Sequence, residues 1–212
     1  MEKKVNSAKQ KAYFAHLKDE RRNCETIEDD LERTRDSLAA RLKAGNRAAA
    51  VELVDIYYKQ IYLFMRRLGH SRQVSEDLTQ ESFLHAWQHI GQLRSGKALN
   101  GWLYRIAGNV SNLHWRRHRN RETVSIEDFD VPDEGENDSD KIERFEQISQ
   151  MRRAVAKLSR KSRQAIILHY MQQLSIAEAA QAAEVREGAF KSRLNRALKA
   201  LRKQIISKDG EL

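Results

Sequence analysis

A strongly acidic stretch near the middle of the chain divides the sequence. Residues 122–140 contain nine Asp or Glu residues and no Lys or Arg, although the whole chain has a formal net charge of +9. The single proline, Pro132, lies inside this stretch, which has few large apolar residues to bury. Such a composition favours a mobile, solvated linker over a packed element. The sequence therefore predicts two small folded domains, one on each side of the linker.

The two parts that flank the acidic stretch are equally basic. Residues 38–121 carry fourteen Lys or Arg against five Asp or Glu, and residues 141–212 carry sixteen against seven, so each part has a net charge of +9. Clustered Lys and Arg gain affinity for nucleic acids by releasing counterions from phosphates. Two basic domains joined by a linker therefore predict a protein that binds a polyanion at two separate places. The alternative is that each charge only solvates a helix face.

Composition also excludes several classes of protein. No run of about 18 apolar residues occurs, and the opening MEKKVNSAKQK lacks the apolar core of a signal peptide, so we expect a cytoplasmic protein. The one cysteine, Cys24, excludes an internal disulfide and a multi-cysteine zinc site. We expect Cys24 to be a small buried or unreactive side chain, with a regulatory thiol as the alternative.

Apolar residues in the first basic part recur at helical spacing. One helix is predicted to end at Gly69, and a second is predicted to begin near Ser75, where Glu76 and Asp77 suit the positive end of a helix dipole. A loop over residues 92–98 follows. The apolar stripe of the first helix comprises Leu53, Ile56, Tyr57, Ile61, Phe64, Met65 and Leu68. The stripe of a third helix comprises Leu99, Leu103, Ile106, Val110 and Leu113.

The third predicted helix ends in polar, basic and aromatic residues. Cations hold a nucleic-acid backbone while flat rings stack on unpaired bases, each stack being worth roughly 1–3 kcal/mol. The pattern therefore favours contact with nucleic acid, and the alternative for Trp102, Tyr104 and Trp115 is packing in the core. The run contains Asn109, Asn112, His114, Trp115, Arg116, Arg117, His118, Arg119 and Arg121.

The second basic part predicts a helix-turn-helix motif. Ser175 and Glu178 form a capping-box pattern that opens an alanine-rich helix over residues 176–183, and a turn is predicted around residues 184–188. The next helix buries Phe190, Leu194, Ala197, Leu198, Leu201 and Ile205, so its other face is polar and basic. A helix with such a face suits the major groove, where Arg and Lys read guanine and Asn reads adenine.

Two other functions compete with an interpretation based on paired DNA-binding domains. A conventional helix-turn-helix regulator would bind an operator unaided and use its first domain for dimerisation or sensing. An enzyme acting on nucleic acid would need a site such as a metal held by the pair His85 and His89 or the pair His114 and His118, each four residues apart. No carboxylate completes a recognisable metal motif with either pair.

Both domains resemble parts of one protein family. The segments LVDIYYKQIYLFMRRLGHSRQVSEDLTQESFLHAWQHI and ALNGWLYRIAGNVSNLHWRRHR resemble region 2 of the extracytoplasmic-function (ECF) group of bacterial sigma-70 sigma factors. The segment LSRKSRQAIILHYMQQLSIAEAAQAAEVREGAFKSRLNRALKALR resembles their region 4. The resemblance covers about residues 40–119 and 152–203. It implies an all-α fold with a region 2 helical bundle and a region 4 helix-turn-helix domain joined by a flexible acidic linker.

The resemblance further implies a transcription initiation factor, which is not an enzyme and needs no cofactor or metal. Such a factor binds core RNA polymerase and directs it to promoters, where region 4 recognises the minus-35 element and region 2 melts and recognises the minus-10 element. The implied partners are the beta-prime clamp helices and the beta flap of the polymerase, promoter DNA and an anti-sigma factor. No small-molecule substrate is expected.

Site residues follow from matching positions in the family. The resemblance assigns polymerase binding to Asp77, Leu78, Gln80 and Glu81. It assigns minus-10 binding to Arg94, Ser95, Lys97, Trp102, Arg105, Asn109, Asn112, Arg116 and Arg117, the first three lying in a loop that helps to capture a flipped base. It assigns minus-35 binding to Lys191, Ser192, Arg193, Asn195, Arg196 and Lys199. The recognition turn commonly begins with glycine in the family, whereas this chain has Glu184 there.

Five segments are predicted in all. Residues 38–121 form the region 2 domain, residues 122–150 the acidic linker and residues 151–206 the region 4 domain, followed by a tail over 207–212. The N-terminal extension, residues 1–37, carries Phe14, Leu17, Cys24, Ile27 and Leu31 near helical spacing, with Leu38 just beyond it. The extension is predicted to be either a helix that packs on the first domain or on a regulator, or a disordered tail of mixed charge.

Overall fold

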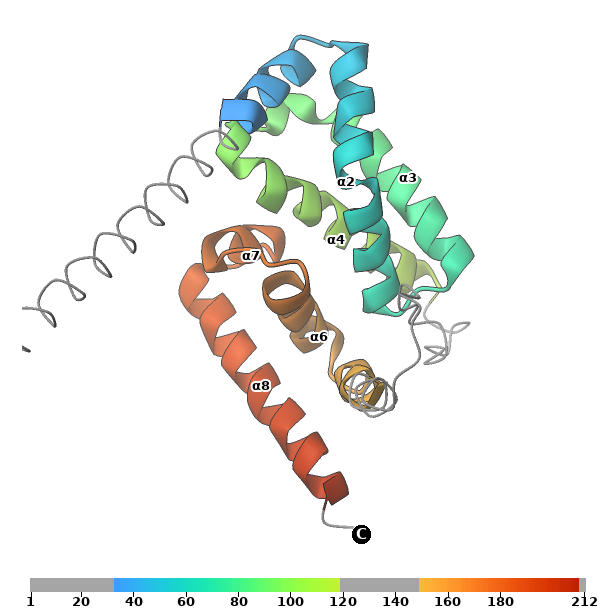
Figure 1. Cartoon of the computed structure of the whole chain (residues 1–212), viewed down its shortest axis with the longest axis vertical. Coiled ribbons are helices and arrows are strands. Elements are labelled where there is room, and N and C mark those ends of the chain that lie inside the picture. Colours follow the sequence, from blue (N-terminus) through green and yellow to red (C-terminus); the bar gives the residue numbers. More distant parts are fainter. Residues whose placement is uncertain (1–32, 119–148, 210–212) are drawn as a thin grey trace, which may run out of the picture.

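The structure, a computed structural model, describes residues 33–118 and 149–209. Every regular element in these two ranges is a helix (Figure 1). The acidic stretch 122–140, Cys24 and the apolar residues of the extension up to Leu31 lie outside the described residues. None of the helices in the described ranges is long and apolar enough to cross a membrane.

The N-terminal domain, residues 33–118, is a bundle around three long helices. A helix over residues 33–43 is followed by α2 (Arg47–Leu68), α3 (Arg72–Gln88) and α4 (Leu99–Arg117). Two short 3₁₀ turns, η1 (Ile90–Gln92) and η2 (Gly96–Ala98), connect α3 to α4. Helix α3 packs against both α2 and α4. The large side chains that are most fully buried in this core include Leu38, Leu42, Ile61, Phe64, Met65, Leu93, Leu99 and Leu103.

Local sequence signals fix the ends of the first two long helices. The Asn46 side chain accepts hydrogen bonds from Ala48 N and Ala49 N, at 2.9 and 3.2 Å, and begins α2. Gly69 ends α2 with φ of 103°, as predicted, because this left-handed conformation suits glycine. Ser71 caps α3 through Val74 N at 3.4 Å.

The structure corrects the sequence prediction at two helices of this domain. Helix α3 begins at Arg72 rather than near Ser75, because the cap is Ser71, and its first turn contains no acidic residue. Ser75 is instead buried inside the helix, and its hydroxyl donates to the His70 carbonyl oxygen at 3.4 Å. In α2, Ile56 is 45% exposed, so it does not belong to the buried stripe.

The C-terminal domain, residues 149–209, is a helix-turn-helix domain, as predicted. It contains a helix over residues 149–156 and then α6 (Arg160–Ile166), the π-helical segment η4 (Ile167–Met171), α7 (Ile176–Ala182) and α8 (Glu187–Asp209). The predicted capping box is present, since the Ser175 hydroxyl accepts from Glu178 N at 3.2 Å and Glu178 accepts from Ser175 N at 2.9 Å. Helix α8 starts at Glu187, so Gly188 is helical rather than part of the turn.

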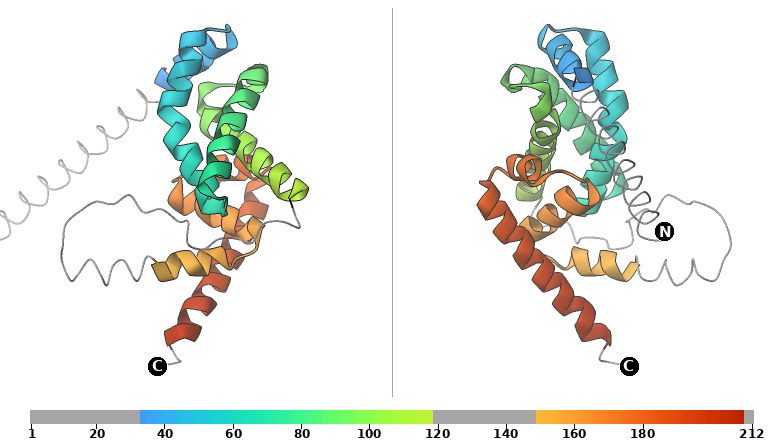
Figure 2. Two further views of the ribbon diagram at one scale, coloured as in Figure 1. Left: turned by 90° about the vertical axis from the view of Figure 1, so that its right-hand side faces the viewer. Right: turned by 60° about the vertical axis from the view of Figure 1, so that its left-hand side comes forward.

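The two domains pack closely against each other. Helix α7 of the C-terminal domain lies along α4 of the N-terminal domain, whereas α8 projects away from the N-terminal domain (Figures 1 and 2). Helix α4 is therefore covered on one side by its own bundle and on the other by α7. Helix α4 buries more than the single predicted stripe, since Trp102, Tyr104, Ala107 and Trp115 are all buried, whereas Ile106 and Leu113 of the stripe are only half-buried.

Candidate nucleic-acid interface

Helix α8 presents one polar and basic face to solvent. Phe190, Leu194, Ala197 and Leu201 are buried against the rest of the C-terminal domain, and Leu198 is half-buried, so residues between them point outward. Among the residues predicted for the minus-35 element, only Arg193 is half-buried. The exposed ones are Lys191, Ser192, Asn195, Arg196 and Lys199.

Hydrogen bonds within α8 hold part of this face in place. The Ser192 hydroxyl donates to the Gly188 carbonyl oxygen at 2.9 Å, and Arg196 Nε donates to the Ser192 carbonyl oxygen at 3.3 Å. The guanidinium of Arg196 thus lies back along the first turns of α8. Lys191 and Arg196 lie in the N-terminal half of the helix, the part that enters the major groove in helix-turn-helix proteins.

Helix α4 and the loop before it carry the residues predicted for the minus-10 element. Arg94, Ser95 and Lys97 are exposed in the loop. Along α4, the side chains of Asn109, Asn112, Arg116 and Arg117 are exposed, and Arg105 is half-buried. The structure therefore brings eight of the nine predicted residues to the surface of one helix and its preceding loop.

The ninth residue, Trp102, is buried. Its side chain is 2% exposed, and its indole Nε1 has no hydrogen-bond partner among the described residues. Trp102 lines a cavity of about 390 Å³ together with Gln92, Arg94, Ala98, Arg105 and Gln181. The size falls at the lower end of the range of roughly 300–1,000 Å³ typical of small-molecule sites.

Three polar side chains of the C-terminal domain lie on the polar face of α4. Glu178, Gln181 and Glu184 are spaced three residues apart in and just after α7, so they share one side of that helix. Asn100 Nδ2 donates to Glu178 Oε1 at 3.2 Å, and Asn109 Nδ2 donates to Glu184 Oε1 at 3.3 Å. The same Glu184 oxygen lies 3.7 Å from Arg105 Nη1.

The closest approach between α4 and α7 occurs at Gly101. A Cβ atom there would lie 2.5 Å from Gln181 Oε1 and 3.0 Å from the carbonyl oxygen of Glu178. Gly108, two turns further along α4, would likewise place a Cβ 2.9 Å from Gln164 Nε2. Two glycines on one side of α4 therefore let the C-terminal domain lie directly on the helix.

Glu184 occupies an unusual backbone conformation. Its φ is 53°, in the left-handed region that favours glycine. Glycine is common at this position in the sigma factors that the sequence resembles. The Glu184 carboxylate reaches both Arg105 and Asn109, and a glycine at this position would lack these contacts.

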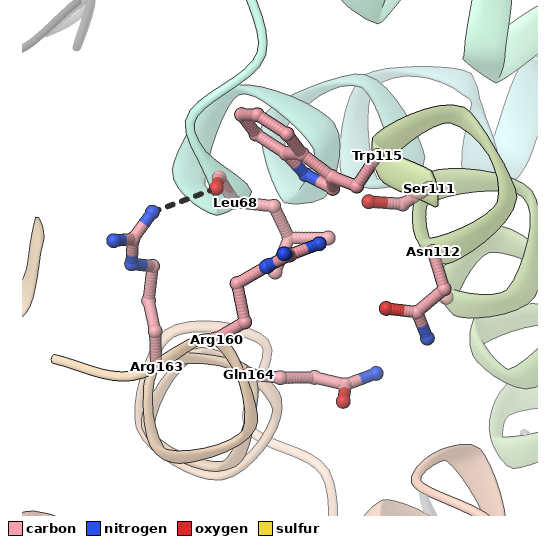
Figure 3. Close-up of a pocket in the computed structure, with 8 residues that line it drawn as sticks. Leu68, Ser111, Asn112, Trp115, Arg160, Arg163 and Gln164 are labelled. Carbon is pink, nitrogen blue, oxygen red and sulfur yellow. Dashed lines mark hydrogen bonds between the residues drawn. The ribbon is translucent and has the colours of Figure 1, made fainter. Parts of the chain in front are cut away.

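A second group of contacts joins the domains at the C-terminal end of α2. Arg163 is 5% exposed, and its Nη1 donates to the Leu68 carbonyl oxygen at 2.9 Å (Figure 3). Its Nη2 donates to the carbonyl oxygens of Leu158, at 3.3 Å, and Ala156. Burial lowers the pKa of the Arg163 guanidinium, with a smaller contribution from the charge of Arg160. The guanidinium therefore bridges the two domains through backbone carbonyl groups.

Two more hydrogen bonds run alongside this bridge. Arg67 Nη1 donates to the Met171 carbonyl oxygen at 3.0 Å, and the Tyr104 hydroxyl donates to Gln172 Oε1 at 2.8 Å. Arg160 lies over the Trp115 ring, with its guanidinium carbon 5.4 Å from the ring centroid (Figure 3).

A buried histidine lies behind Trp115. His70 is 2% exposed, its Nε2 is 2.7 Å from Ser111 Oγ, and its ring stacks on Trp115 with centroids 4.9 Å apart. The pKa of His70 is lowered to about 3, chiefly by burial and to a smaller extent by the neighbouring charges of His114, Arg160 and Arg163. His70 is therefore neutral at physiological pH.

The residues predicted to bind polymerase lie on α3. Asp77 and Gln80 are exposed and Glu81 is half-buried, so their side chains reach the surface. Leu78 is 3% exposed and packs in the core, so it positions α3 rather than contributing surface area. Glu81 Oε1 also lies 3.6 Å from His85 Nε2, one turn further along the helix.

The histidine pairs stack but form no larger cluster of metal-ligating side chains. The ring centroids are 5.9 Å apart for His85 and His89 and 4.2 Å apart for His114 and His118. Within residues 33–118 and 149–209, no group of three or more His, Cys, Asp or Glu side chains could hold a metal ion.

Sequence reasoning did not identify the interdomain residues Glu178, Gln181, Glu184 and Arg163. The three-residue spacing of the first three was visible, but its meaning depended on a helix 70 residues earlier in the chain. Arg163 carried no signal that separated it from the many other basic residues of its domain.

Comparison with known protein families identifies both domains. The model of Sigma-70 region 2 matches residues 53–121, and the model of Sigma-70 region 4 matches residues 148–201. Two solved structures share the fold. CnrH, in complex with the cytosolic domain of CnrY, has a TM-score of 0.61 at 23% identity over 82% of this chain and 98% of CnrH. The sigma factor RpoE from Bartonella quintana, in complex with the anti-sigma factor NepR, has a TM-score of 0.59 at 24% identity over 73% of this chain and 94% of RpoE.

Relatives with similar sequences match this chain over most of their own length. The ECF RNA polymerase sigma factor SigW of Bacillus subtilis is 30% identical over 174 residues, which cover 77% of this chain and 92% of SigW. The ECF RNA polymerase sigma factor SigM of Mycobacterium tuberculosis is 30% identical over 167 residues, which cover 78% of this chain and 82% of SigM. Matches to both regions, in the same order and over most of the length of these relatives, show that the chain belongs to the ECF group of RNA polymerase sigma factors and is a polymerase-directing transcription initiation factor rather than a stand-alone regulator.

Proposed function

We propose that this sigma factor binds core RNA polymerase and reads a promoter through two separate faces, α8 for the minus-35 element and α4 with its preceding loop for the minus-10 element. The observation that carries the proposal is the outward-facing row on α8, with Lys191, Asn195 and Arg196 exposed in the recognition helix of an intact helix-turn-helix. A long basic side chain such as Arg reads guanine in the major groove, and Asn reads adenine.

The N-terminal domain is proposed to hold opened DNA. Arg105, Asn109, Arg116 and Arg117 lie along one helix and suit the phosphates and base edges of a separated strand. The cavity beside Trp102 suits a base flipped from that strand, because an aromatic side chain and the basic side chains of Arg94 and Arg105 line it. Melting is then a shift in population, driven by tighter binding of the open strand than of the duplex, and no covalent bond is made or broken. We therefore infer that the protein is not an enzyme.

Helix α3 is proposed to dock on the beta-prime clamp helices of the polymerase. Asp77 and Gln80 are exposed, and Glu81 is half-buried, on one side of α3. Carboxylates at this position suit basic residues on the partner and would raise the rate of association. Region 4 is proposed to contact the beta flap. A protein that makes these contacts would act in the cytoplasm, and we infer that an anti-sigma factor competes there with the polymerase.

The arrangement of the two domains is proposed to be the resting state of the free protein. Glu178, Gln181 and Glu184 occupy the polar face of α4, so a DNA strand cannot bind Asn109 and Arg105 while α7 lies there. The carboxylates take the place that phosphates would take. We infer that polymerase separates the domains when it binds each of them, and that the free protein binds promoters weakly.

Association with the polymerase tests the proposal at the level of binding. The full chain would be incubated with core enzyme and fragmented genomic DNA, and the complex would be isolated by size exclusion and its DNA sequenced. We expect the bound fragments to share two motifs at a fixed spacing, and only when core enzyme is present. Enrichment of the same fragments without core enzyme, or a palindromic motif, would argue for operator binding instead.

A further inference from the structure

The first described helix touches the loop that carries Arg94, Ser95 and Lys97. The helix over residues 33–43 precedes the segment that matches Sigma-70 region 2, yet its first turn meets this loop. The Gly96 backbone N–H donates to Asp36 Oδ1 at 2.7 Å across 60 positions of sequence. This bond supplies an acceptor to the first residue of η2, whose own N-cap, Ser95, makes no side-chain capping bond.

The contact at Gly96 is too close for any other residue. A Cβ atom on Gly96 would lie 2.4 Å from Asp36 N and 2.5 Å from the carbonyl carbon of Arg35, both of which are backbone atoms. Backbone atoms cannot turn aside as the end of a flexible side chain can. The loop and the helix therefore meet backbone to backbone, at a position where only glycine fits.

The other end of the helix makes a second contact with the same loop. Lys43 Nζ donates to the Arg94 carbonyl oxygen at 3.2 Å. Between the two contacts the helix is fixed to the core by Leu38 and Leu42, which are 2% and 1% exposed. The loop backbone is thus held at Arg94 and at Gly96 by one helix, which Leu38 and Leu42 anchor in the core.

We propose that Asp36 is a positioning residue for base selection in the minus-10 element. By accepting the Gly96 N–H, Asp36 fixes the loop between Leu93 and Ala98, whose exposed Arg94 lines the cavity beside Trp102. Asp36 acts through the loop and does not touch DNA. The inference rests on the proposed function, because it requires that the loop and cavity bind a promoter base.

The proposal assigns the effect to the acceptor oxygen and not to the charge of Asp36. A carboxylate close to Arg94 and Lys97 would oppose the binding of phosphate, so its charge alone would weaken DNA binding. Asp36→Asn keeps an acceptor at Oδ1 and removes the charge, whereas Asp36→Ala removes both. The two variants therefore separate positioning from electrostatics.

The test combines a measurement on the free chain with one on the complete complex. Amide hydrogen exchange of residues 92–98 reports the loop directly, and we expect Asp36→Ala to accelerate it about fivefold and Asp36→Asn to leave it within about twofold of the wild type. With core polymerase, open-complex formation would be compared between a bound promoter and versions with single changes in the minus-10 element. We expect Asp36→Ala to reduce this discrimination by a similar factor, and Asp36→Asn to preserve it.

Two further variants control the experiment. Arg41 lies on the same helix and forms a partly exposed ion pair with Glu52 at 2.7 Å. Arg41→Ala breaks this pair but should change neither the loop exchange nor the promoter discrimination. Lys43→Met removes the second contact from an exposed position, so it provides an independent test if Asp36→Ala does not fold; we expect about a fourfold change, outside the twofold range that counts as unchanged. No open complex with wild-type protein on any promoter would overturn the proposed function and this inference with it. The inference alone would be overturned by a different result. In that case the wild-type protein forms open complexes, but neither Asp36→Ala nor Lys43→Met changes the exchange of the loop or the discrimination between promoters.

Discussion

Arg163 Nη1 donates a hydrogen bond to the carbonyl oxygen of Leu68, 95 positions earlier in the chain, at 2.9 Å. Leu68 is the last residue of α2 in the N-terminal domain, and Arg163 is a buried residue of α6 in the C-terminal domain. Carbonyl groups at the end of a helix carry partial negative charge, so they suit a buried cation. The Arg163 side chain thus caps the C-terminal end of α2 and joins the C-terminal domain to the N-terminal domain.

Replacing Arg163 by methionine should lower stability strongly. The change leaves the carbonyl oxygens of Leu68 and Leu158 without their donor in a buried site. We expect the free energy of unfolding to fall by about 3 kcal/mol, measured by urea denaturation followed by circular dichroism. Arg160→Ala is the matched control, because exposed Arg160 contacts Trp115 through a cation–π interaction, and its loss should cost under about 1 kcal/mol. Equal midpoints for Arg163→Met and the wild type would show that the bridge does not stabilise the fold.

Replacing Glu184 by glycine should increase the affinity of the free protein for single-stranded DNA. The change removes the carboxylate that contacts Arg105 and Asn109. Glycine also adopts the positive φ of 53° at this position without strain. Because the contact is partly exposed, we expect roughly a threefold gain, measured by fluorescence anisotropy with a labelled oligonucleotide. Glu52→Gln removes an equal charge on the outer side of α2 and should give a smaller gain. Unchanged affinity in Glu184→Gly would argue against α7 as an intramolecular competitor.

Stability should fall as the pH is lowered below about 6.5, in part because of His70. The folded state holds His70 neutral, with its pKa lowered to about 3, whereas the unfolded chain binds a proton near pH 6.5. The unfolded state therefore gains protons first as the pH falls, so the stabilisation is complete above pH 6.5 and is lost progressively towards pH 3. We expect His70 to account for a loss of about 2 kcal/mol between pH 7.5 and 5.

The variant His70→Gln isolates this contribution. Glutamine can still bond to Ser111 but does not titrate, so all other groups remain common to both proteins. Urea denaturation at several pH values should give a shallower decline for His70→Gln than for the wild type. Parallel curves for the two proteins would mean that His70 titrates alike in the folded and unfolded states.

Replacing Arg196 by alanine should weaken recognition of the upstream promoter element. Arg196 is exposed on the outer face of α8, in the half of the helix proposed to enter the major groove. We expect the affinity of the polymerase complex for its promoter to fall about tenfold, measured by electrophoretic mobility shift at fixed salt. Arg202→Ala changes the same residue type nearly two turns further along α8, at another exposed position, and should have a smaller effect. A larger loss with Arg202→Ala would place the interface elsewhere on the helix.

Much of the fold could be predicted because local signals determine it. The glycine at the end of α2, the capping box at Ser175 and Glu178 and the spacing of Phe190, Leu194 and Leu201 all act within one or two helical turns. The choice between two nearby serines as the cap of α3 could not be made in this way. Both Ser71 and Ser75 have the side chain of a cap, and only the packing of Ser75 against His70 decides between them.

The interdomain surface was beyond sequence reasoning for a different physical reason. Buried Tyr104 lies against the C-terminal domain, where its hydroxyl donates to Gln172, 68 positions later in the chain. Helical periodicity describes one helix at a time, so it indicates a single buried stripe on α4 and not the second one. The same limit applies to Asp36 and Gly96, which look like an ordinary surface acid and a loop glycine until they are seen together.

Run-off transcription tests the central claim most directly. Purified core polymerase, the full-length chain and a promoter library made from the genome that encodes it would be combined, and the transcripts would be sequenced. The account predicts transcripts with defined start sites that require both the chain and the core enzyme, and that decrease when Arg196 or Asn109 is replaced by alanine. The absence of any transcript that depends on the chain, across the whole library, would contradict it.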